Sequence, residues 1–370
     1  TNTLTMQSSH ATHVVVGISG GVDSAVAAAL LKDQGLQVTG LFMKNWEEDD
    51  DAAYCGAAED LAVAETVCAQ LGVRLHTVNF SHEYWERVFA VFLREYRSGR
   101  TPNPDILCNK EIKFREFLDY AEYLGADAIA TGHYARRETR GGLPTLCKGV
   151  DQEKDQSYFL YSVSPEALNK TLFPLGQLTK TEVRRRARDL GLQNSERKDS
   201  TGICFIGEPR FKDFLARYLP NEPGRIETPE GAFIGEHDGL WFYTLGQRQG
   251  LDIGGPGEAW YVSGKNVARN VLEVVQGHDH PALMCNRLRA IEPHWLTDDF
   301  PTTPLLCAAK TRYRQDDQSC LVHQVSHGTI DIEFEVPQRA ATPGQALVLY
   351  HGDRVLGGGT IDQIGCPIDG

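Results

Sequence analysis

Short apolar runs alternate with segments of helical periodicity through the first half of the chain. The apolar runs predict buried strands at residues 13–18, 36–43, 74–80 and 126–131. Apolar positions three and four apart predict helices at residues 25–33, 57–71, 82–98 and 110–124. Strands that alternate with helices are typical of parallel strands joined by crossover helices. The first half therefore predicts an open α/β sheet.

The pattern changes after Gly207, where glycine and proline become frequent and helical periodicity fades. Alternating residues at 226–228 and 240–243 predict short strands. From about Leu288, apolar runs recur at the close spacing of an antiparallel barrel or sandwich, at residues 305–310, 320–325, 329–336, 346–350 and 355–361. We expect three domains, namely an α/β domain at 1–207, a small β-rich linking domain at 208–284 and a C-terminal antiparallel β-barrel at 285–370.

Length and charge narrow the class of protein. A chain of 370 residues is long enough for two or three domains, each with its own core. A net charge of −13 argues against a protein that coats nucleic acid through its overall field, although a local basic face stays possible. One candidate is a predicted helix with four arginines, for which a solvated helix face is the alternative. These arginines are Arg184, Arg185, Arg186 and Arg188.

Cysteine usage and hydropathy indicate the compartment. The nine cysteines are too dilute for a secreted disulfide scaffold, and the absence of a CxxC pair excludes a zinc ribbon or cluster site of that spacing. No apolar run approaches the ~18 residues of a membrane span. Residues 1–13 lack the basic start and apolar stretch of a signal peptide. We expect a soluble, cytoplasmic protein.

A glycine-rich loop lies between the first predicted strand and the first predicted helix. Such a turn lets backbone N–H groups and a helix N-terminus face an anion, while the two serines add hydroxyl donors. The pattern is neither a Walker P-loop nor GxGxxG, which argues against γ-phosphoryl transfer and dinucleotide binding. The loop residues are Gly17, Ile18, Ser19, Gly20, Gly21, Val22, Asp23 and Ser24.

Asp23 is unusual in a phosphate loop because its carboxylate would repel bound phosphates. It is useful there if it caps the helix or approaches Mg²⁺ carried by those phosphates. The alternative for the whole loop is an ordinary strand-to-helix turn with Asp23 or Ser24 as the N-cap. The complete SGGVDS string favours a nucleotide.

Two further segments place a cysteine in a setting that suits chemistry. In residues 101–110, two prolines stiffen a predicted loop in which Asp105 and Cys108 lie three apart and Asn109 can cap the next helix. In residues 198–207, Cys204 follows a basic stretch that favours a thiolate. For each cysteine taken alone, a small buried side chain is the alternative.

The SGGVDS string resembles the PP-loop of ATP pyrophosphatases, which split ATP between the α- and β-phosphates and adenylate an acceptor. NPDILCNKEIKF and STGICFIG resemble the tRNA-uridine 2-sulfurtransferase family, which thiolates the wobble uridine of tRNA. Matching motifs follow in order along nearly the whole chain, among them FMKNWEEDD, ATGHYAR, KDQSYFL, TLGQR, KTRYRQ and PGQ. The resemblance implies a Rossmann-like PP-loop domain, and it implies ATP and Mg²⁺ as cofactors.

The resemblance also implies roles for individual residues. It makes Cys204 the persulfide carrier, Cys108 the second catalytic cysteine and Asp105 the acid/base. At ATP it implies the loop residues 17–24, Met43 and Gly132. At tRNA it implies Asn103, Pro104, Asp105, His133, Lys154, Asp155, Gln156, Arg312, Tyr313 and Gln345.

Some of these assignments have structural alternatives. His133 follows a predicted strand at the edge where open α/β sheets bind ligands, and a satisfied structural histidine is the alternative. Residues 312–314 are predicted to form a strand that contacts tRNA, and an ordinary exposed strand is the alternative. The other cysteines have no motif around them and are expected to pack. They are Cys55, Cys68, Cys147, Cys285, Cys307, Cys320 and Cys366.

The implied reaction is ATP-dependent 2-thiolation with a Cys108–Cys204 disulfide left after sulfur transfer. It requires that the two α carbons come within ~7 Å in some state. The implied partners are tRNA and a persulfide donor protein, either a sulfur-relay protein or a cysteine desulfurase. The alternatives are another PP-loop ligase or sulfurtransferase with a different acceptor, and a non-catalytic nucleotide sensor or tRNA-binding protein.

Overall fold

The structure is a computed structural model that describes residues 12–47, 56–198, 202–203, 206–207, 215–296, 301–326 and 328–365. Two compact units make up the chain. The first unit contains residues 1–89, 104–208 and 353–356, and the second contains residues 90–103, 209–352 and 357–370. No helix among the described residues is long and apolar enough to cross a bilayer.

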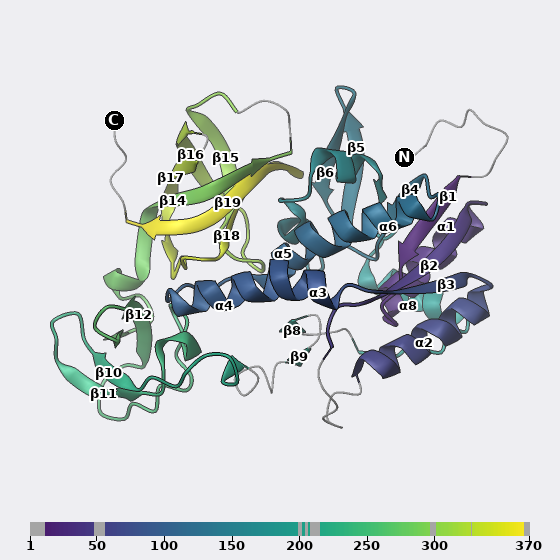
Figure 1. Ribbon diagram of the computed structural model, residues 1–370. Helices are drawn as coiled ribbons and strands as arrows, with labels where there is room; N and C mark the ends of the chain where they lie inside the picture. Colours follow the sequence, from purple (N-terminus) through teal and green to yellow (C-terminus); the bar gives the residue numbers. More distant parts are fainter. Residues whose placement is uncertain are drawn as a thin grey trace. The chain divides into compact units, whose positions relative to one another are not determined.

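A parallel sheet forms the centre of the first unit (Figure 1). Its register places Val14, Val15 and Val16 of the first strand between neighbours on both sides, and all three are fully buried. Strands buried on both faces read as continuous apolar runs, which is why the sequence predicts them. In sheet order, the described strands are β3 (Arg74–Asn79), β2 (Gln37–Lys44), β1 (His13–Gly17), β4 (Ala128–Ala130) and β7 (Thr171–Leu172).

Helices connect these strands, and the predicted open α/β sheet is confirmed. The helix predicted at 25–33 begins three residues earlier, directly behind the glycine loop. The described helices of the first unit are α1 (Val22–Asp33), α2 (Gly56–Leu71), α3 (Ser81–Tyr84), α5 (Pro104–Cys108), α6 (Phe117–Tyr123), α7 (Pro165–Asn169) and α8 (Lys180–Asp189). A short 3-10 helix, η3, covers Ser157–Leu160.

Two helices of the first unit contain π-helical turns, η1 (Trp85–Phe89) and η2 (Asn109–Glu116). Arg87 of η1 forms an ion pair with Glu116 of η2. π-helical turns are rare and often occur at functional sites. Here η2 directly follows Cys108, so the irregular turn lies beside a residue of the expected chemistry.

Two antiparallel pairs complete the first unit. β5 (Ala135–Arg140) and β6 (Leu143–Lys148) form a hairpin that the sequence analysis did not predict, although its Gly141–Gly142 turn is a hairpin signal. The short strands β8 (Gly202–Ile203) and β9 (Ile206–Gly207) also pair.

The second unit begins with α4 (Ala90–Arg97) and contains a four-stranded sheet followed by a barrel. In order, the described strands of the smaller sheet are β11 (Phe233–His237), β10 (Gly224–Glu227), β13 (Val271–Gln276) and β12 (Trp260–Asn266). The strand predicted at 226–228 corresponds to β10. The strand predicted at 240–243 is wrong, because the structure has a 3-10 helix, η5 (Leu240–Phe242), there.

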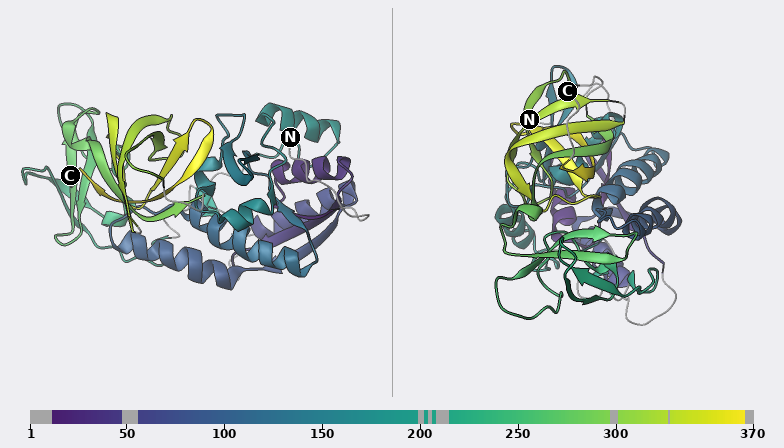
Figure 2. Two further views of the ribbon diagram at one scale, coloured as in Figure 1. Left: turned by 90° about the horizontal axis from the view of Figure 1, so that it is seen from above. Right: turned by 90° about the vertical axis from the view of Figure 1, so that its left-hand side faces the viewer.

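The barrel is closed by pairing between its first and last strands. In order around the wall, the described strands are β14 (Met284–Trp295), β17 (Thr329–Arg339), β16 (Gln318–Val325), β15 (Leu305–Lys310), β18 (Ala346–His351) and β19 (Arg354–Ile364). β19 pairs with β14, and Figure 2 shows the strands curving around the wall. The predicted antiparallel barrel is confirmed, and a 3-10 turn, η6 (Pro281–Leu283), precedes it.

Lys265 is an exception to the apolar core of the smaller sheet. A β-bulge between Val262 and Gly264 shifts the register, so that Lys265 lies opposite Leu272, a fully buried core residue. Its Nζ atom is buried and has no hydrogen-bond partner among the described residues. Burial lowers the pKa of Lys265 to about 8 because a charged amine loses its hydration.

We expect Lys265→Met to raise the thermal unfolding temperature at pH 7. The folded-state pKa lies below the unfolded value of about 10.4, so the burial penalty on the charged amine is fully present below pH 8. Wild-type stability should rise between pH 8 and 10, where the unfolded state binds more protons, and the variant should lack this rise. The gain at pH 7 is on the order of 1–3 kcal/mol. Lys265→Arg, which stays charged, is the control, and equal melting temperatures for wild type and Lys265→Met contradict the argument.

Candidate functional site

The glycine loop leaves the carboxyl end of β1 and leads directly into α1. Gly20 has φ +78°, a conformation that favours glycine, and Gly21 is the N-cap of α1 without a side-chain cap. The expected alternative of Asp23 or Ser24 as N-cap is therefore wrong. Ser24 Oγ instead accepts from Ser19 N at 3.2 Å and donates to Gly21 O at 3.1 Å. The loop is braced from within and presents backbone N–H groups at a helix N-terminus, the geometry of an anion site.

Asp23 forms an ion pair at the start of α1. Lys180 Nζ lies 2.8 Å from both carboxylate oxygens of Asp23, and Tyr134 Oη donates to Asp23 Oδ1 at 2.8 Å. The Lys180 side chain is only 11% exposed. Since the Lys180 ammonium and the Tyr134 hydroxyl already bind the Asp23 carboxylate, this carboxylate is not available as a direct ligand of Mg²⁺. The structure thus pairs the acidic residue of the loop with a cation instead.

Lys180 was not predicted as a site residue from the sequence, although a local sequence signal marks the start of the helix on which it lies. Thr179 and Glu182 form a capping box, in which Thr179 Oγ1 accepts from Glu182 N at 3.3 Å and Glu182 Oε2 accepts from Thr179 N at 2.7 Å. Lys180 is therefore the first residue of α8. The pattern T-x-x-E in the sequence marks this helix start, but only the tertiary structure shows that it meets Asp23.

Two residues expected at ATP border the glycine loop. A methyl group on Gly17 would lie 3.4 Å from Met43 Cε, so Met43 of β2 packs beside the loop. A methyl group on Gly132 would lie 2.9 Å from the backbone N of Ser24. Gly132 thus permits close approach between the segment after β4 and the first turn of α1. The carboxyl ends of neighbouring parallel strands form the edge where such sheets bind ligands.

The carbonyl oxygen of Gly20 accepts hydrogen bonds from two side chains outside the loop. Asn194 Nδ2 donates to it at 3.0 Å and Arg197 Nη1 donates at 3.3 Å. Arg197 Nη2 also pairs with Asp60 Oδ1 at 2.5 Å. The segment that follows α8 therefore contacts the glycine loop directly.

Cys108 lies in a helix, so the loop expected at residues 101–110 is partly wrong. Pro104 opens α5, where its missing N–H costs nothing, and Asp105 and Cys108 are one turn apart. Asn109 does not cap a helix as expected. It is 2% exposed, and its Nδ2 donates to Phe159 O at 3.1 Å. Cys108 itself is fully buried.

One continuous helical segment joins Cys108 to the glycine loop. Phe114 of η2 packs against His133 with ring centroids 5.8 Å apart. Phe117 opens α6, and its Cε1 would lie 3.3 Å from a methyl group on Gly17. The segment that begins at Asp105 and Cys108 thus continues to the wall of the expected nucleotide site.

Cys204 lies outside the described residues, between β8 and β9. The expected approach of its α carbon to that of Cys108 therefore stays a prediction. Residues 199–201 and 208–214, which flank the two short strands, also lie outside the described part of the chain.

His133 is buried, with 9% of its surface exposed. Its Nδ1 lies 2.8 Å from Thr131 Oγ1, and its ring packs near Phe114 and Phe173. Burial lowers the pKa of His133 well below its usual value, and the positive charge of Lys113 lowers it further. The imidazole is therefore neutral at pH 7. This environment supports a role in positioning the segment after β4.

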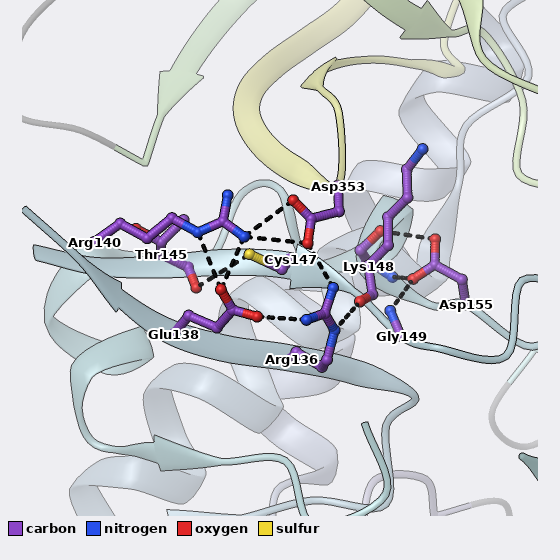
Figure 3. Close-up of polar contacts among 10 residues, drawn as sticks. Arg136, Glu138, Arg140, Thr145, Cys147, Lys148, Gly149, Asp155 and Asp353 are labelled. Atoms are coloured by element: carbon purple, nitrogen blue, oxygen red, sulfur yellow. Dashed lines mark hydrogen bonds and ion pairs between the residues drawn. The ribbon is translucent and has the colours of Figure 1, made fainter. Parts of the chain in front are cut away.

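Asp155 and Gln156 organise the segment that follows the β5–β6 hairpin. Asp155 is 6% exposed, and its Oδ1 accepts from Gly149 N at 3.0 Å (Figure 3). The same oxygen accepts from Ser157 N at 3.1 Å. Gln156 Oε1 accepts from Tyr134 N at 3.0 Å. Gln156 thus holds the backbone of Tyr134, whose hydroxyl donates to Asp23, while Asp155 holds the turn around it. Lys154, beside them, is half-buried.

Glu138 and Cys147 of the hairpin lie together with Asp353, which directly precedes β19, within reach of one cation. Figure 3 shows Arg136 and Arg140 between the two carboxylates. Asp353 accepts from Arg136 Nη2 at 2.6 Å and from Arg140 Nη2 at 3.0 Å, and Glu138 accepts from both arginines. Two guanidinium groups already balance the carboxylates, so these residues do not fit a metal ion.

Arg312 and Tyr313 lie in the turn between β15 and β16, so the strand expected at 312–314 is wrong. Arg312 is exposed and Tyr313 is half-buried. On the same unit, Gln345 Nε2 donates to Thr101 O at 2.7 Å and Thr101 N donates to Pro343 O at 2.9 Å. The PGQ segment thus holds the chain two residues before Asn103.

Two of the remaining cysteines have buried thiols of low reactivity. Cys68 and Cys147 are buried, and burial raises the pKa of each thiol to about 11. Since the thiolate is the reactive form, both side chains are inert at neutral pH. Cys55 and Cys366 lie outside the described residues.

Comparison with known families covers most of the chain. Residues 12–208 match a family described as tRNA methyl transferase HUP domain, residues 212–276 match the tRNA methyl transferase PRC-barrel domain, and residues 285–361 match the aminomethyltransferase beta-barrel domain. These three matches follow one another in order along the chain.

Curated relatives are similar over almost their full length. The chain is 62% identical to the tRNA-specific 2-thiouridylase MnmA of Methylococcus capsulatus, over 95% of this chain and 96% of the relative. It is 58% identical to the proteins of the same name from Vibrio cholerae, over 95% and 96%, and Legionella pneumophila, over 95% and 98%. A solved 4-thiouridine synthetase–RNA complex with bound ATP has a TM-score of 0.33 at 20% identity, covering 57% of this chain and 51% of that one. A similarity of that size carries no argument.

Proposed function

The chain belongs to the MnmA family of tRNA-specific 2-thiouridylases, and we infer that it is a tRNA-uridine 2-sulfurtransferase that thiolates the wobble uridine of tRNA with the use of ATP. The identity of 62% over 95% of the chain is the observation that carries this conclusion. Two matching domain families are named after methyl transfer. We take the activity from the curated relatives because they match 95% of the chain.

The reaction needs activation because the C2 oxygen of uracil is a poor leaving group. We propose that this oxygen attacks the α-phosphorus of ATP and that pyrophosphate leaves from the glycine loop. The N–H groups at the start of α1 and the Lys180 ammonium would stabilise the phosphate charge. Mg²⁺ would be held by the nucleotide phosphates, since Lys180 and Tyr134 occupy Asp23. The arrangement of Met43, Gly132 and the loop supports the nucleotide position.

Sulfur would come from a persulfide on Cys204. Either its outer sulfur attacks C2 and Cys108 then attacks the Cys204 sulfur, breaking the S–S bond, or Cys108 attacks the inner sulfur first and releases hydrosulfide as the nucleophile. Both routes leave a Cys108–Cys204 disulfide and release AMP once sulfur is bound to C2. Turnover then requires a thiol reductant, and loading requires a persulfide donor protein. A cytoplasmic location fits this cycle, because a reducing compartment returns the disulfide to thiols.

Asp105 is our candidate acid/base because it lies one helical turn from Cys108. We propose that Asn103, Pro104 and Asp105 meet the target base, which must leave its stacked loop to react. Arg312 and Tyr313 would contact tRNA elsewhere. The burial and internal bonds of His133, Asp155 and Gln156 support a positioning role beside Lys154, and Gln345 would hold the segment before Asn103.

We also propose the three-domain division at 1–207, 208–284 and 285–370. The matched families cover residues 12–208, 212–276 and 285–361, which supports boundaries near these positions. Each domain would then contribute to the tRNA contact, because the net charge of −13 offers no global attraction to nucleic acid.

The experiment that tests the activity uses the purified chain, tRNA, ATP and a persulfide donor. Nucleoside mass analysis should show 2-thiouridine at the wobble position, with AMP formed in step. Product formed equally well without ATP would refute the adenylation. A ligase with another acceptor would consume ATP without thiolating tRNA, and a non-catalytic sensor would bind without any product.

We expect Arg312→Ala to weaken tRNA binding while ATP binding is unchanged. Arg312 is an exposed cation on a turn, and each lost phosphate contact lowers the salt dependence of binding by about one unit of slope. Affinity measured at several salt concentrations checks both effects. Val336→Ala, which removes an exposed apolar side chain from β17 of the same barrel, is the control. An unchanged slope would remove Arg312 from the tRNA contact.

A further inference from the structure

The Gly20–Gly21 peptide joins the two adjacent glycines of the glycine loop. Gly20 has φ +78°, and neither residue has a side chain that limits rotation of this peptide. A peptide group is planar and trans, so its C=O and N–H point in opposite directions. In one orientation the loop presents the N–H of Gly21 to an anion, and in the flipped orientation it presents the carbonyl oxygen of Gly20, which would repel phosphate.

Asn194 and Arg197, which lie outside the loop in the segment after α8, hold the carbonyl of Gly20. The two donors lie 3.0 and 3.3 Å from Gly20 O. On the opposite side, the N–H of Gly21 is directed toward Ser19 Oγ at 3.4 Å, within the loop. The N–H is therefore on the side of the loop hydroxyls, where a phosphate would be bound.

The segment that supplies these donors is itself rigid. Arg184 Nη1 donates to Ser195 O and to Arg197 O, both at 3.1 Å. Leu192 is 3% exposed and packs in the core of the first unit. Asn194 is also 3% exposed, which makes its amide a fixed donor rather than a surface contact.

We propose that Asn194 and Arg197 are positioning residues that lock the Gly20–Gly21 peptide in its phosphate-binding orientation. This inference rests on the proposed binding of ATP by the glycine loop. If the proposal holds, replacing either residue weakens binding of the phosphate groups only, because neither residue needs to contact adenine or ribose. Loss of either donor lets the carbonyl turn inward, and the loop then loses an N–H donor and gains a repulsive oxygen.

The test compares two probes, the α,β-methylene analogue of ATP and adenosine, by calorimetry. We expect Asn194→Leu and Arg197→Met to weaken binding of the analogue about tenfold, or ~1.4 kcal/mol, with adenosine affinity unchanged. Arg197→Lys keeps a charged donor and should recover most of the lost affinity. Glu196→Gln is the matched control, because Glu196 lies in the same segment, is 75% exposed and pairs with Arg188 instead.

Each outcome decides the proposal. Unchanged affinity for the analogue in both variants would overturn it. Equal losses for the analogue and adenosine would also overturn it, since they indicate general distortion of the site. The Arg197 side chain is 30% exposed, so the Arg197→Met variant should fold and can test the proposal even where Asn194→Leu does not fold. Failure of the wild-type chain to bind the analogue would instead refute the proposed ATP site itself.

Discussion

Replacing Cys108 with serine should abolish 2-thiouridine formation, with a loss of at least about 10³-fold in rate. Both sulfur-transfer routes require this thiol, because each ends in a disulfide that serine cannot form. Cys108 is fully buried in α5, so the nearly isosteric serine should leave the fold intact. The measurement is nucleoside mass analysis of tRNA after incubation with ATP and a loaded donor. Binding of tRNA and ATP should persist.

Cys285→Ser provides the control, since Cys285 lies in β14, outside the expected chemistry. This variant should thiolate at the wild-type rate. Full activity of Cys108→Ser would remove the disulfide mechanism while leaving the family assignment in place. Loss of tRNA binding together with activity would mean that Cys108 acts through the structure of its helix.

Replacing Lys180 with methionine should lower the rate of adenylation by about 10²–10³-fold. The substitution removes a cation at the glycine loop and leaves the Asp23 carboxylate without its 2.8 Å partner. An unbalanced carboxylate beside triphosphate then repels the substrate. Pyrophosphate release in the presence of tRNA reports this step.

The double variant Asp23→Asn with Lys180→Met separates repulsion from loss of the cation. It should recover part of the activity lost in Lys180→Met, because the uncompensated charge is gone. A residual defect then measures what the ammonium itself contributes. If Lys180→Met releases pyrophosphate at the wild-type rate, the Lys180–Asp23 ion pair stabilises the structure but does not contribute to adenylation.

The candidate site was partly visible in the sequence because some of its chemistry is local. Apolar runs fixed the strands β1 and β2, and the glycine string between β1 and α1 indicated an anion site before any contact was known. Local sequence signals were less reliable where the same residues are compatible with a loop and with the start of a helix. Prolines at 102 and 104 read as a loop, whereas Pro104 opens the helix that carries Cys108.

Local patterns also failed where a strand ends in a turn. Residues 312–314 follow closely after β15, but the chain reverses there, because β16 pairs with β15 in an antiparallel register that begins at Ala309 and Gln318. Residues 240–243 have the composition of a strand but close a 3-10 turn. Composition alone does not determine which partner a strand finds.

Sequence by itself determined the family and the α/β pattern of the first half of the chain, and it indicated candidate residues for the reaction, since each depends on a few neighbouring positions. Only the tertiary structure decided which distant side chains complete the site. Lys180 meets Asp23 across 157 positions, and Asn194 meets Gly20 across 174. The physical reason is that periodicity and propensity act over a few residues, whereas these contacts arise when α8 and the segment after it pack against α1 and the glycine loop, which come from a distant part of the chain.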